Sequence, residues 1–178
     1  MTERSRSAKK AGEVRLLFLD IDGVMTDGRI TMNHRGEETK SFDAKDGLGL
    51  KMLMSGGIEI ILVSGRRSRA VQSRAEELGI CEVYQGVSDK RTLCIEVIRK
   101  KGLQKKAIGC IGDDLPDLCM FEEAGLRIAV ADAVREVRQA ADYITKNRGG
   151  FGAVREACEW LLKCQGKWKG LVAAVTAK

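Results

Sequence analysis

The chain has 178 residues, of which 44% are hydrophobic and 31% charged, and its formal net charge is +6. This length suits one compact domain, and this composition excludes a disordered or fibrous protein. The longest apolar runs, such as residues 58–63, are far shorter than the roughly 20 residues of a membrane-spanning helix, so we expect no membrane protein. The positive charge favours an anionic partner. With 4% aromatic residues the chain offers few platforms for stacking bases, so an anionic metabolite is expected rather than a nucleic acid.

The two ends of the chain carry few signs of regular structure. Residues 1–12 combine basic and small polar residues, with no following apolar segment of the kind that directs export, and predict a flexible basic tail. Residues 165–178 mix lysines with a short apolar stretch and are interpreted as a C-terminal tail, which leaves residues 13–164 as the domain. The six cysteines are scattered without a CxxC pair, which predicts a reduced, cytoplasmic protein.

Apolar runs and helical patterns alternate along the domain. The predicted strands, in chain order, are residues 14–19, 58–63, 107–111 and 126–130. The predicted helices are residues 48–54, 68–78, 89–101, 115–124, 133–140 and 153–163. Strands that alternate with helices of this length predict a parallel sheet covered on both faces, which is a doubly wound α/β fold.

One segment breaks this alternation. Residues 28–42 contain two short β-prone pieces on either side of Asn33-His34-Arg35-Gly36, and they show no helical period. The pattern predicts a β-hairpin in place of a larger inserted domain, with His34 as a turn residue rather than a catalyst. An isolated hairpin is marginally stable in water, so it is expected to pack on its own domain or on another subunit.

Polar residues follow the predicted strands where a parallel sheet directs its carboxyl ends toward a ligand. The groups are Asp20-Ile21-Asp22-Gly23, Ser64-Gly65-Arg66, Ser88-Asp89-Lys90, and Gly112-Asp113-Asp114 with Asp117. Carboxylates gathered in this way repel one another unless a cation lies between them. Oxygen ligands without imidazole or thiolate suit Mg²⁺ and argue against zinc. For Asp114, a helix cap remains as good an interpretation as a functional role.

The same residues predict a phosphoryl-transfer chemistry. A carboxylate on a metal that also holds a phosphate can attack phosphorus and form an aspartyl-phosphate. A second carboxyl two residues later can protonate the departing alcohol and then deprotonate the attacking water. Lys90, together with the hydroxyl and backbone N–H groups around Ser64, can neutralise the charge on the transferred group.

The order of these motifs resembles the haloacid dehalogenase-like phosphatases. Within that superfamily, the chain is similar to the family of 3-deoxy-D-manno-octulosonate 8-phosphate phosphatases, from residue 14 to about residue 166. The segments that carry the resemblance are LDIDGVMTDG, FDAKDGLGLK, VSGR, YQGVSDK, GDDLPD and GGFGAVRE. It implies a Mg²⁺-dependent phosphomonoesterase in lipopolysaccharide precursor biosynthesis, acting on a phosphorylated sugar acid. It also implies a homotetramer in which the hairpins associate and a neighbour covers each active site.

The resemblance assigns roles to individual residues. Asp20 matches the nucleophile and a metal ligand. Asp22 matches the general acid and base, with its backbone carbonyl also on the metal. Asp113 matches the remaining metal ligand, and Asp117 a carboxylate that orients metal-bound water. The positions that match phosphate-binding or sugar-acid-binding residues are Asp22, Ser64, Lys90, Asp43, Ala44, Lys45, Asp46, Gly47, Lys51, Arg66 and Arg74.

The chain departs from the family pattern at three positions. The family usually has arginine where this chain has Lys45, Lys51 and Phe151. Lysine keeps the charge but lacks the planar fork that grips a carboxylate through two hydrogen bonds. Arg148 is a candidate for the missing guanidinium. These departures bear on the identity of the sugar acid and leave the phosphoryl-transfer residues unchanged.

Several alternatives stay open on the residues alone. Arg66 favours the eight-carbon acid, because phosphatases of related nine-carbon sugar acid 9-phosphates tend to have another residue there. A non-catalytic oligomerisation module is a second alternative, although such a module would need neither Asp20 nor Asp22. Nucleic-acid binding, a third alternative, predicts an affinity that falls with salt. Arg66 and Arg74 are equally well interpreted as surface charges.

Overall fold

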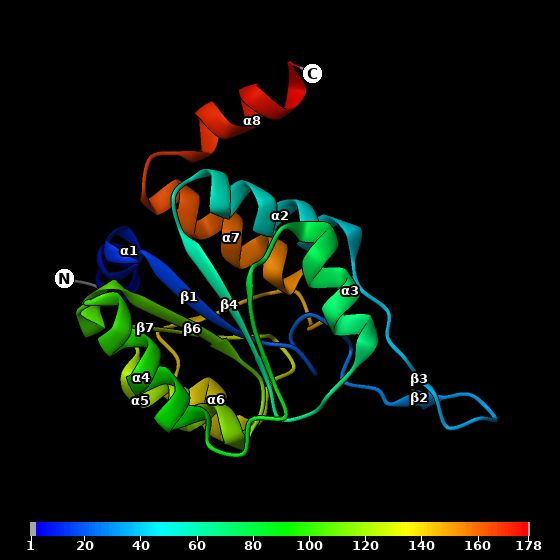
Figure 1. The fold of residues 1–178 in the computed structure, drawn as a ribbon. Helices are drawn as coiled ribbons and strands as arrows, with labels where there is room; N and C mark the ends of the chain where they lie inside the picture. The colour runs from blue at the N-terminus through cyan, green and yellow to red at the C-terminus, as the bar shows by residue number, and fades with distance from the viewer. Residues whose placement is uncertain (1–2, 178) are drawn as a thin grey trace.

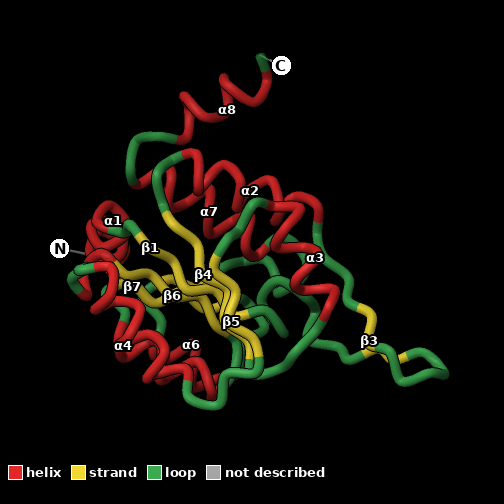
Figure 2. The backbone as a smooth tube through the Cα atoms, in the orientation of Figure 1, coloured by secondary structure: helices red, strands yellow, loops and turns green. Residues whose placement is uncertain are grey.

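The computed structural model describes residues 3–177, and its centre is a six-stranded parallel sheet (Figures 1 and 2). The strand order is β5-β4-β1-β6-β7-β8, and every neighbouring pair is parallel. The strands are β1 (Leu16–Asp20), β4 (Glu59–Ser64), β5 (Glu82–Gln85), β6 (Ile108–Gly112), β7 (Leu126–Ala129) and β8 (Tyr143–Ile144). The predicted α/β fold class is confirmed.

Helices cover both faces of the sheet, as Figure 1 shows. One face carries α2 (Ala44–Ser55), α3 (Arg69–Leu78) and α7 (Ala153–Cys164). The other carries α4 (Lys90–Lys101), α5 (Leu118–Glu123) and α6 (Arg135–Ala140). Two short 3-10 turns, η1 (Lys105–Ala107) and η2 (Leu115–Asp117), precede β6 and α5 in the chain. All five residues of β1 are buried, because the central strand is covered on both sides.

The strand register brings the predicted site motifs to one edge of the sheet. Leu19 lies opposite Leu62 of β4 on one side and Ile111 of β6 on the other. The residues that follow these three positions therefore leave the sheet at the same level. The loops after β1, β4 and β6 meet there.

The N-terminal segment is helical where the sequence predicts a flexible tail. Helix α1 (Glu3–Glu13) buries Ala11 completely against the domain. Its polar side chains bind the start of β8: Ser7 Oγ donates to the Asp142 carbonyl at 2.6 Å, and Lys10 Nζ lies 2.7 Å from the Asp142 carboxylate. These tertiary contacts stabilise a helix whose own sequence is polar. The first two residues of the predicted tail lie outside the described residues.

A helix also occurs in the predicted C-terminal tail. Helix α8 (Trp168–Thr176) packs its first turn on the domain, where Trp168 lies 5.3 Å from the Arg155 guanidinium and 5.7 Å from the Lys163 ammonium. Such cation–π contacts hold the aromatic ring against α7. The rest of α8 extends away from the sheet (Figure 1). Residue 178 lies outside the described residues.

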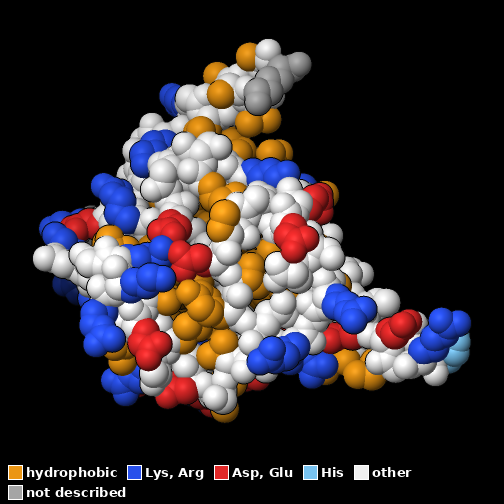
Figure 3. Space-filling model, in the orientation of Figure 1, with side chains coloured by type: hydrophobic (Ala, Val, Ile, Leu, Met, Phe, Trp, Pro, Cys, Tyr) orange, Lys and Arg blue, Asp and Glu red, His pale blue; other side chains and the backbone are white. Residues whose placement is uncertain are grey.

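The hairpin is present, with two paired residues in each strand. Strand β2 (Thr31–Met32) pairs antiparallel with β3 (Glu38–Thr39), and the Gly36 N–H closes the turn by donating to the Asn33 carbonyl at 3.0 Å. The hairpin projects from the domain, with basic side chains and the single histidine at its tip (Figure 3). Among the described residues, no helix has the length and apolar character needed to span a membrane.

Candidate active site

Three carboxylates meet where β1 and β6 end. Asp20 is the last residue of β1, Asp113 follows β6, and Asp117 closes η2. Each offers a ligand atom that lies within 4.8 Å of the other two. Asp20 and Asp117 are only 5% and 1% exposed. Charged groups buried so close together require a positive partner.

Lys90 supplies part of that positive charge. It is the first residue of α4, whose start is fixed by Asp89, because the Asp89 side chain accepts from the Thr92 N–H at 3.0 Å. The Lys90 ammonium lies 2.6 Å from Asp20 Oδ1 and 2.7 Å from Asp117 Oδ1. One lysine among three carboxylates leaves the cluster with an excess of negative charge, which a divalent cation would balance.

The pKa values of the cluster reflect this excess. Burial, followed by repulsion from Asp117, raises the pKa of Asp20 to about 7. Burial, followed by repulsion from Asp20, raises the pKa of Asp113 to about 8. Burial lowers the pKa of Lys90, but the charges of Asp20 and Asp117 outweigh it and raise the pKa above its usual range, so this lysine stays charged.

Both carboxylate oxygens of Asp117 accept hydrogen bonds from the described part of the protein, whereas those of Asp113 do not. Asp117 Oδ1 faces Lys90, and its Oδ2 accepts from the backbone N–H groups of Asp113 at 2.9 Å and Asp114 at 3.3 Å. Within residues 3–177, no N–H or O–H group donates a hydrogen bond to the Asp113 carboxylate. Asp117 therefore holds the loop after β6 in shape, while Asp113 remains free to bind a cation. Asp114 caps η2 by accepting from the Leu115 N–H at 2.8 Å, which favours the capping interpretation.

Asp22 lies beside this cluster and is held at both oxygens. Ser64 Oγ donates to Asp22 Oδ2 at 3.2 Å, and the Lys40 ammonium pairs with Asp22 Oδ1. Ser64 Oγ in turn accepts from the Arg66 N–H at 3.0 Å. The predicted neighbours Asp22 and Ser64 are thus brought together, whereas Lys40 was not among the predicted site residues. The sequence feature that could have predicted Lys40 is its spacing of two residues from Glu38, which places both side chains on the same face of an extended chain.

The loop after β1 packs closely on the Asp113 side chain and on the backbone of the glycine-rich segment before α7. A Cβ on Gly23 would lie 2.0 Å from Asp113 Oδ2, and one on Gly149 would lie 1.6 Å from the Gly23 carbonyl oxygen. Gly23 also has a φ of 97°, which favours glycine. The glycine-rich segment before α7 therefore packs directly on the loop that carries Asp22.

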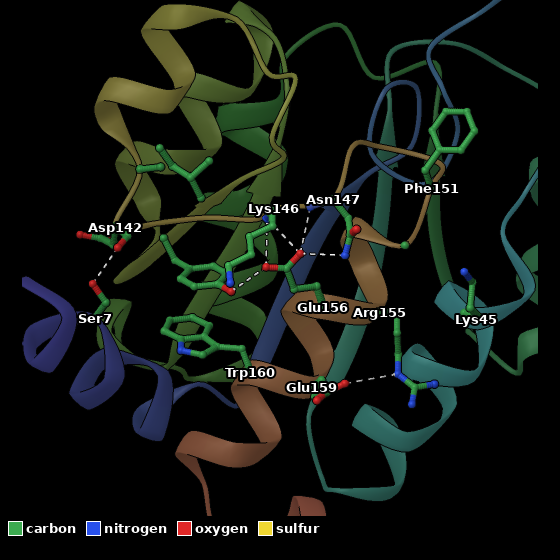
Figure 4. Close-up of a pocket in the computed structure, with 14 residues that line it drawn as sticks. Ser7, Lys45, Asp142, Lys146, Asn147, Phe151, Arg155, Glu156, Glu159 and Trp160 are labelled. Carbon is green, nitrogen blue, oxygen red and sulfur yellow. Dashed lines mark hydrogen bonds and ion pairs between the residues drawn. The ribbon is translucent and has the colours of Figure 1, made fainter.

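Glu156 holds that glycine-rich segment in place. Its carboxylate accepts from the backbone N–H groups of Lys146 and Asn147 at 2.9 to 3.0 Å, and from the Tyr143 hydroxyl at 3.0 Å. Figure 4 shows these contacts on one side of a cavity of about 980 Å³. Asp20, Asp113, Asp117 and Lys90 do not line this cavity, and Lys45 is the one predicted sugar-acid residue in its lining.

The predicted sugar-acid residues fall into two groups. Lys45, Lys51 and Arg66 are exposed, so their charges are available to a ligand. Arg74 is mostly buried: its guanidinium lies 2.7 Å from Glu77 and donates to the Asp43 carbonyl at 3.4 Å. Arg74 therefore supports the stretch that begins α2. Ala44 is the first residue of α2, and a Cβ on Gly47 would collide with the Arg74 guanidinium at 2.3 Å.

Asp46 is 2% exposed and links α2 to α7. Its Oδ1 accepts from the Arg155 N–H at 2.7 Å, which caps the first turn of α7 from a different helix. Burial raises the pKa of Asp46 to about 6, although hydrogen bonds from the backbone of Arg155 and Gly152 oppose that effect. This contact positions the glycine-rich segment relative to the predicted sugar-acid stretch.

Phe151, where the family usually has arginine, and the nearby Arg148 are both exposed. Phe151 is 57% exposed. Arg148, the candidate replacement for the missing guanidinium, lies 3.1 Å from the Asp132 carboxylate, and its side chain is 71% exposed. Its guanidinium is therefore turned to Asp132 in this structure.

The fold and this cluster agree with what comparison with known proteins shows. A family model described as haloacid dehalogenase-like hydrolase matches residues 79–156, and the chain belongs to that class. The 3-deoxy-D-manno-octulosonate 8-phosphate phosphatase of Escherichia coli K12 is 42% identical over 158 residues, which is 89% of this chain and 84% of the relative. Within the class, this chain is a member of the 3-deoxy-D-manno-octulosonate 8-phosphate phosphatase family, as the sequence resemblance predicts.

Solved structures of the same family superpose closely. The phosphatase of Moraxella catarrhalis, in complex with a magnesium ion, a phosphate ion and a KDO molecule, is 42% identical, with a TM-score of 0.93 over 96% of this chain and 98% of that one. A cobalt-bound form from Haemophilus influenzae is 38% identical, with a TM-score of 0.86 over 89% of this chain and 93% of that one.

Proposed function

We propose that the chain hydrolyses the phosphate monoester of 3-deoxy-D-manno-octulosonate 8-phosphate through an aspartyl-phosphate on Asp20. The observation that carries this proposal is the buried cluster of Asp20, Asp113, Asp117 and Lys90, in a chain 42% identical over most of its length to phosphatases of that ester. A non-catalytic module would have no reason to keep so much uncompensated charge buried.

Asp20 and Asp113 are the residues that would hold Mg²⁺, together with the backbone carbonyl of Asp22. Their hard oxygen atoms and the negative excess of the cluster fit that ion. When bound, Mg²⁺ would neutralise the repulsion between the Asp20 carboxylate and the substrate phosphate. Lys90 binds an oxygen of Asp20 and carries a charge that can also stabilise the transferred phosphoryl group.

The reaction follows from these positions in two steps. In the first, the Asp20 oxygen that does not face Lys90 attacks phosphorus, the bond from phosphorus to the sugar oxygen breaks, and Asp22 gives its proton to that oxygen. In the second, Asp22 takes a proton from water as the water oxygen attacks phosphorus. The bond between phosphorus and Asp20 then breaks, and inorganic phosphate leaves. Ser64 keeps Asp22 oriented through both steps.

The substrate is tested by measuring phosphate release from two esters. We expect the octulosonate 8-phosphate to be hydrolysed with a higher kcat/KM than a nine-carbon sugar acid 9-phosphate, because Arg66 stands where the nine-carbon phosphatases tend to have another residue. Inorganic phosphate is measured under matched Mg²⁺ concentrations. A preference for the nine-carbon ester would transfer the proposal to that substrate.

We propose that the chain forms a homotetramer through its hairpins. Support comes from the projecting hairpin, on which Ile30 and Met32 are 53% and 58% exposed. Size-exclusion chromatography with light scattering is expected to give four times the mass of the chain, and a fully active monomer would contradict this assembly. We also propose a cytoplasmic location, which the six free thiols support.

A further inference from the structure

Lys40 is a buried lysine at the foot of the hairpin. It follows β3, and its side chain is 1% exposed, although residues 27–37 are all exposed. Burial lowers the pKa of Lys40, but hydrogen bonds and charges from Asp22 and Glu38 outweigh that effect, so the pKa is raised above its ordinary value. The ammonium is therefore charged. A lysine is rarely buried to this extent unless its charge is paired.

The contacts of Lys40 form a line of alternating charges. Its ammonium pairs with Asp22 Oδ1 and lies 2.6 Å from Glu38 Oε1. The other carboxylate oxygen of Glu38 lies 3.7 Å from the Arg66 guanidinium. The hairpin thus reaches two residues that the proposed reaction uses: Asp22 as acid and base, and Arg66 as a contact for the sugar acid.

We propose that Lys40 is a positioning residue that holds the Asp22 carboxylate in the orientation needed for proton transfer to the leaving group. With Lys40 on Oδ1 and Ser64 on Oδ2, the carboxyl group is fixed at two points and cannot turn freely about its terminal bond. Because Oδ1 faces the ammonium, the proton that Asp22 transfers is carried on Oδ2. A small displacement of a group that transfers a proton is costly in rate. The inference rests on the proposed function, because it requires Asp22 to act as the general acid.

The test compares leaving groups in a Lys40→Met variant. The sugar-acid ester and phenyl phosphate release basic oxygens that need a proton, whereas 2,4-dinitrophenyl phosphate releases a weakly basic phenolate that does not. Because kcat/KM reports the steps up to loss of the leaving group, we expect it to fall about 100-fold for the first two esters and less than about threefold for the third. Lys40→Arg is expected to restore part of the loss.

Two controls separate positioning from a structural effect. Lys100→Met removes an exposed lysine of α4 and is expected to leave all three kcat/KM values unchanged. In an Asp22→Asn background, Lys40→Met is expected to cause no further loss, since Lys40 acts through Asp22. Circular dichroism and thermal melting show whether each variant is folded. If Lys40→Met does not fold, the same comparison is made with Lys40→Arg, in which the longer, planar head group shifts the contact with Asp22.

Each outcome decides for or against the proposal. Equal losses with all three esters, no loss with any, or an undiminished effect in the Asp22→Asn background would overturn it. If the unmodified enzyme cleaves both aryl phosphates but leaves the octulosonate ester intact, the proposed substrate is wrong, and Lys40 is still tested by the two aryl phosphates. Failure of the unmodified enzyme with all three esters would reject the function and the inference together.

Discussion

Asp20→Asn is expected to lower the rate of phosphate release by at least about 10⁴-fold, because loss of a catalytic nucleophile typically reduces turnover by that factor or more. The amide has almost the same shape as the carboxylate but is a far weaker nucleophile, so no phosphoryl-enzyme forms. Steady-state phosphate release gives the rate, and acid quenching with a radiolabelled substrate shows the phosphoryl-enzyme in the unmodified protein and its absence in the variant.

The fold of this variant is expected to survive. The substitution removes one charge from a cluster that holds three carboxylates against one lysine, which relieves repulsion in the metal-free protein. The melting temperature of the variant at pH 8 should therefore be no lower than that of the unmodified protein. Glu96→Gln, which alters an exposed carboxylate of α4, serves as the control and should keep full activity. Substantial turnover by purified, folded Asp20→Asn would refute covalent catalysis at this position.

Removal of Mg²⁺ is expected to abolish turnover, and Mg²⁺ binding is expected to weaken as the pH falls from 8 to 6. The pKa values of Asp20 and Asp113 in the metal-free fold are about 7 and about 8, so protons compete with the cation for these oxygens across that range. The apparent dissociation constant should rise by up to about tenfold per pH unit for each proton displaced. Titration calorimetry in buffers of different ionisation enthalpy measures both the affinity and the protons released.

The stability of the metal-free protein should show the opposite dependence. Because the folded state raises both carboxyl pKa values, it binds more protons than the unfolded chain between about pH 4 and pH 8. The free energy of unfolding contributed by these groups therefore decreases as the pH rises through that range. Saturating Mg²⁺ should reverse the loss at pH 8. A metal affinity that does not change between pH 6 and pH 8, with no proton release, would contradict this account of the cluster.

The proximity of Asp20 and Asp113 could be predicted from the sequence because of a simple structural rule. Asp20 and Asp113 each follow a continuous apolar run, and the ends of such parallel strands meet at one edge of a sheet. The doubly wound fold could be predicted for the same reason: buried strands and amphipathic helices alternate with clear turn residues. The position of Lys90 in this cluster could be predicted only from the order of the motifs along the chain, since a lysine at the start of a helix usually faces water.

Other features depend on tertiary contacts that leave little trace in the sequence. Helix α1 has a polar sequence, and the burial of Ala11 and the contacts with Asp142 stabilise it. The edge strands β5 and β8 are short and only partly buried, so they lack an apolar run. Glu156 has the pattern of a surface residue of α7, and only the folded chain shows that it fixes the loop before that helix.

The position of β1 has a consequence for synthesis on the ribosome. β1 emerges first among the sheet strands, yet its two neighbours are the later strands β4 and β6, and Lys90 lies between those two in the sequence. A nascent chain that has released only its first half therefore exposes Asp20 and Asp22 to water, far from Asp113. The acidic residues become crowded only after β6 docks, so the electrostatic cost of bringing them together arises late, when most of the core is available to offset it.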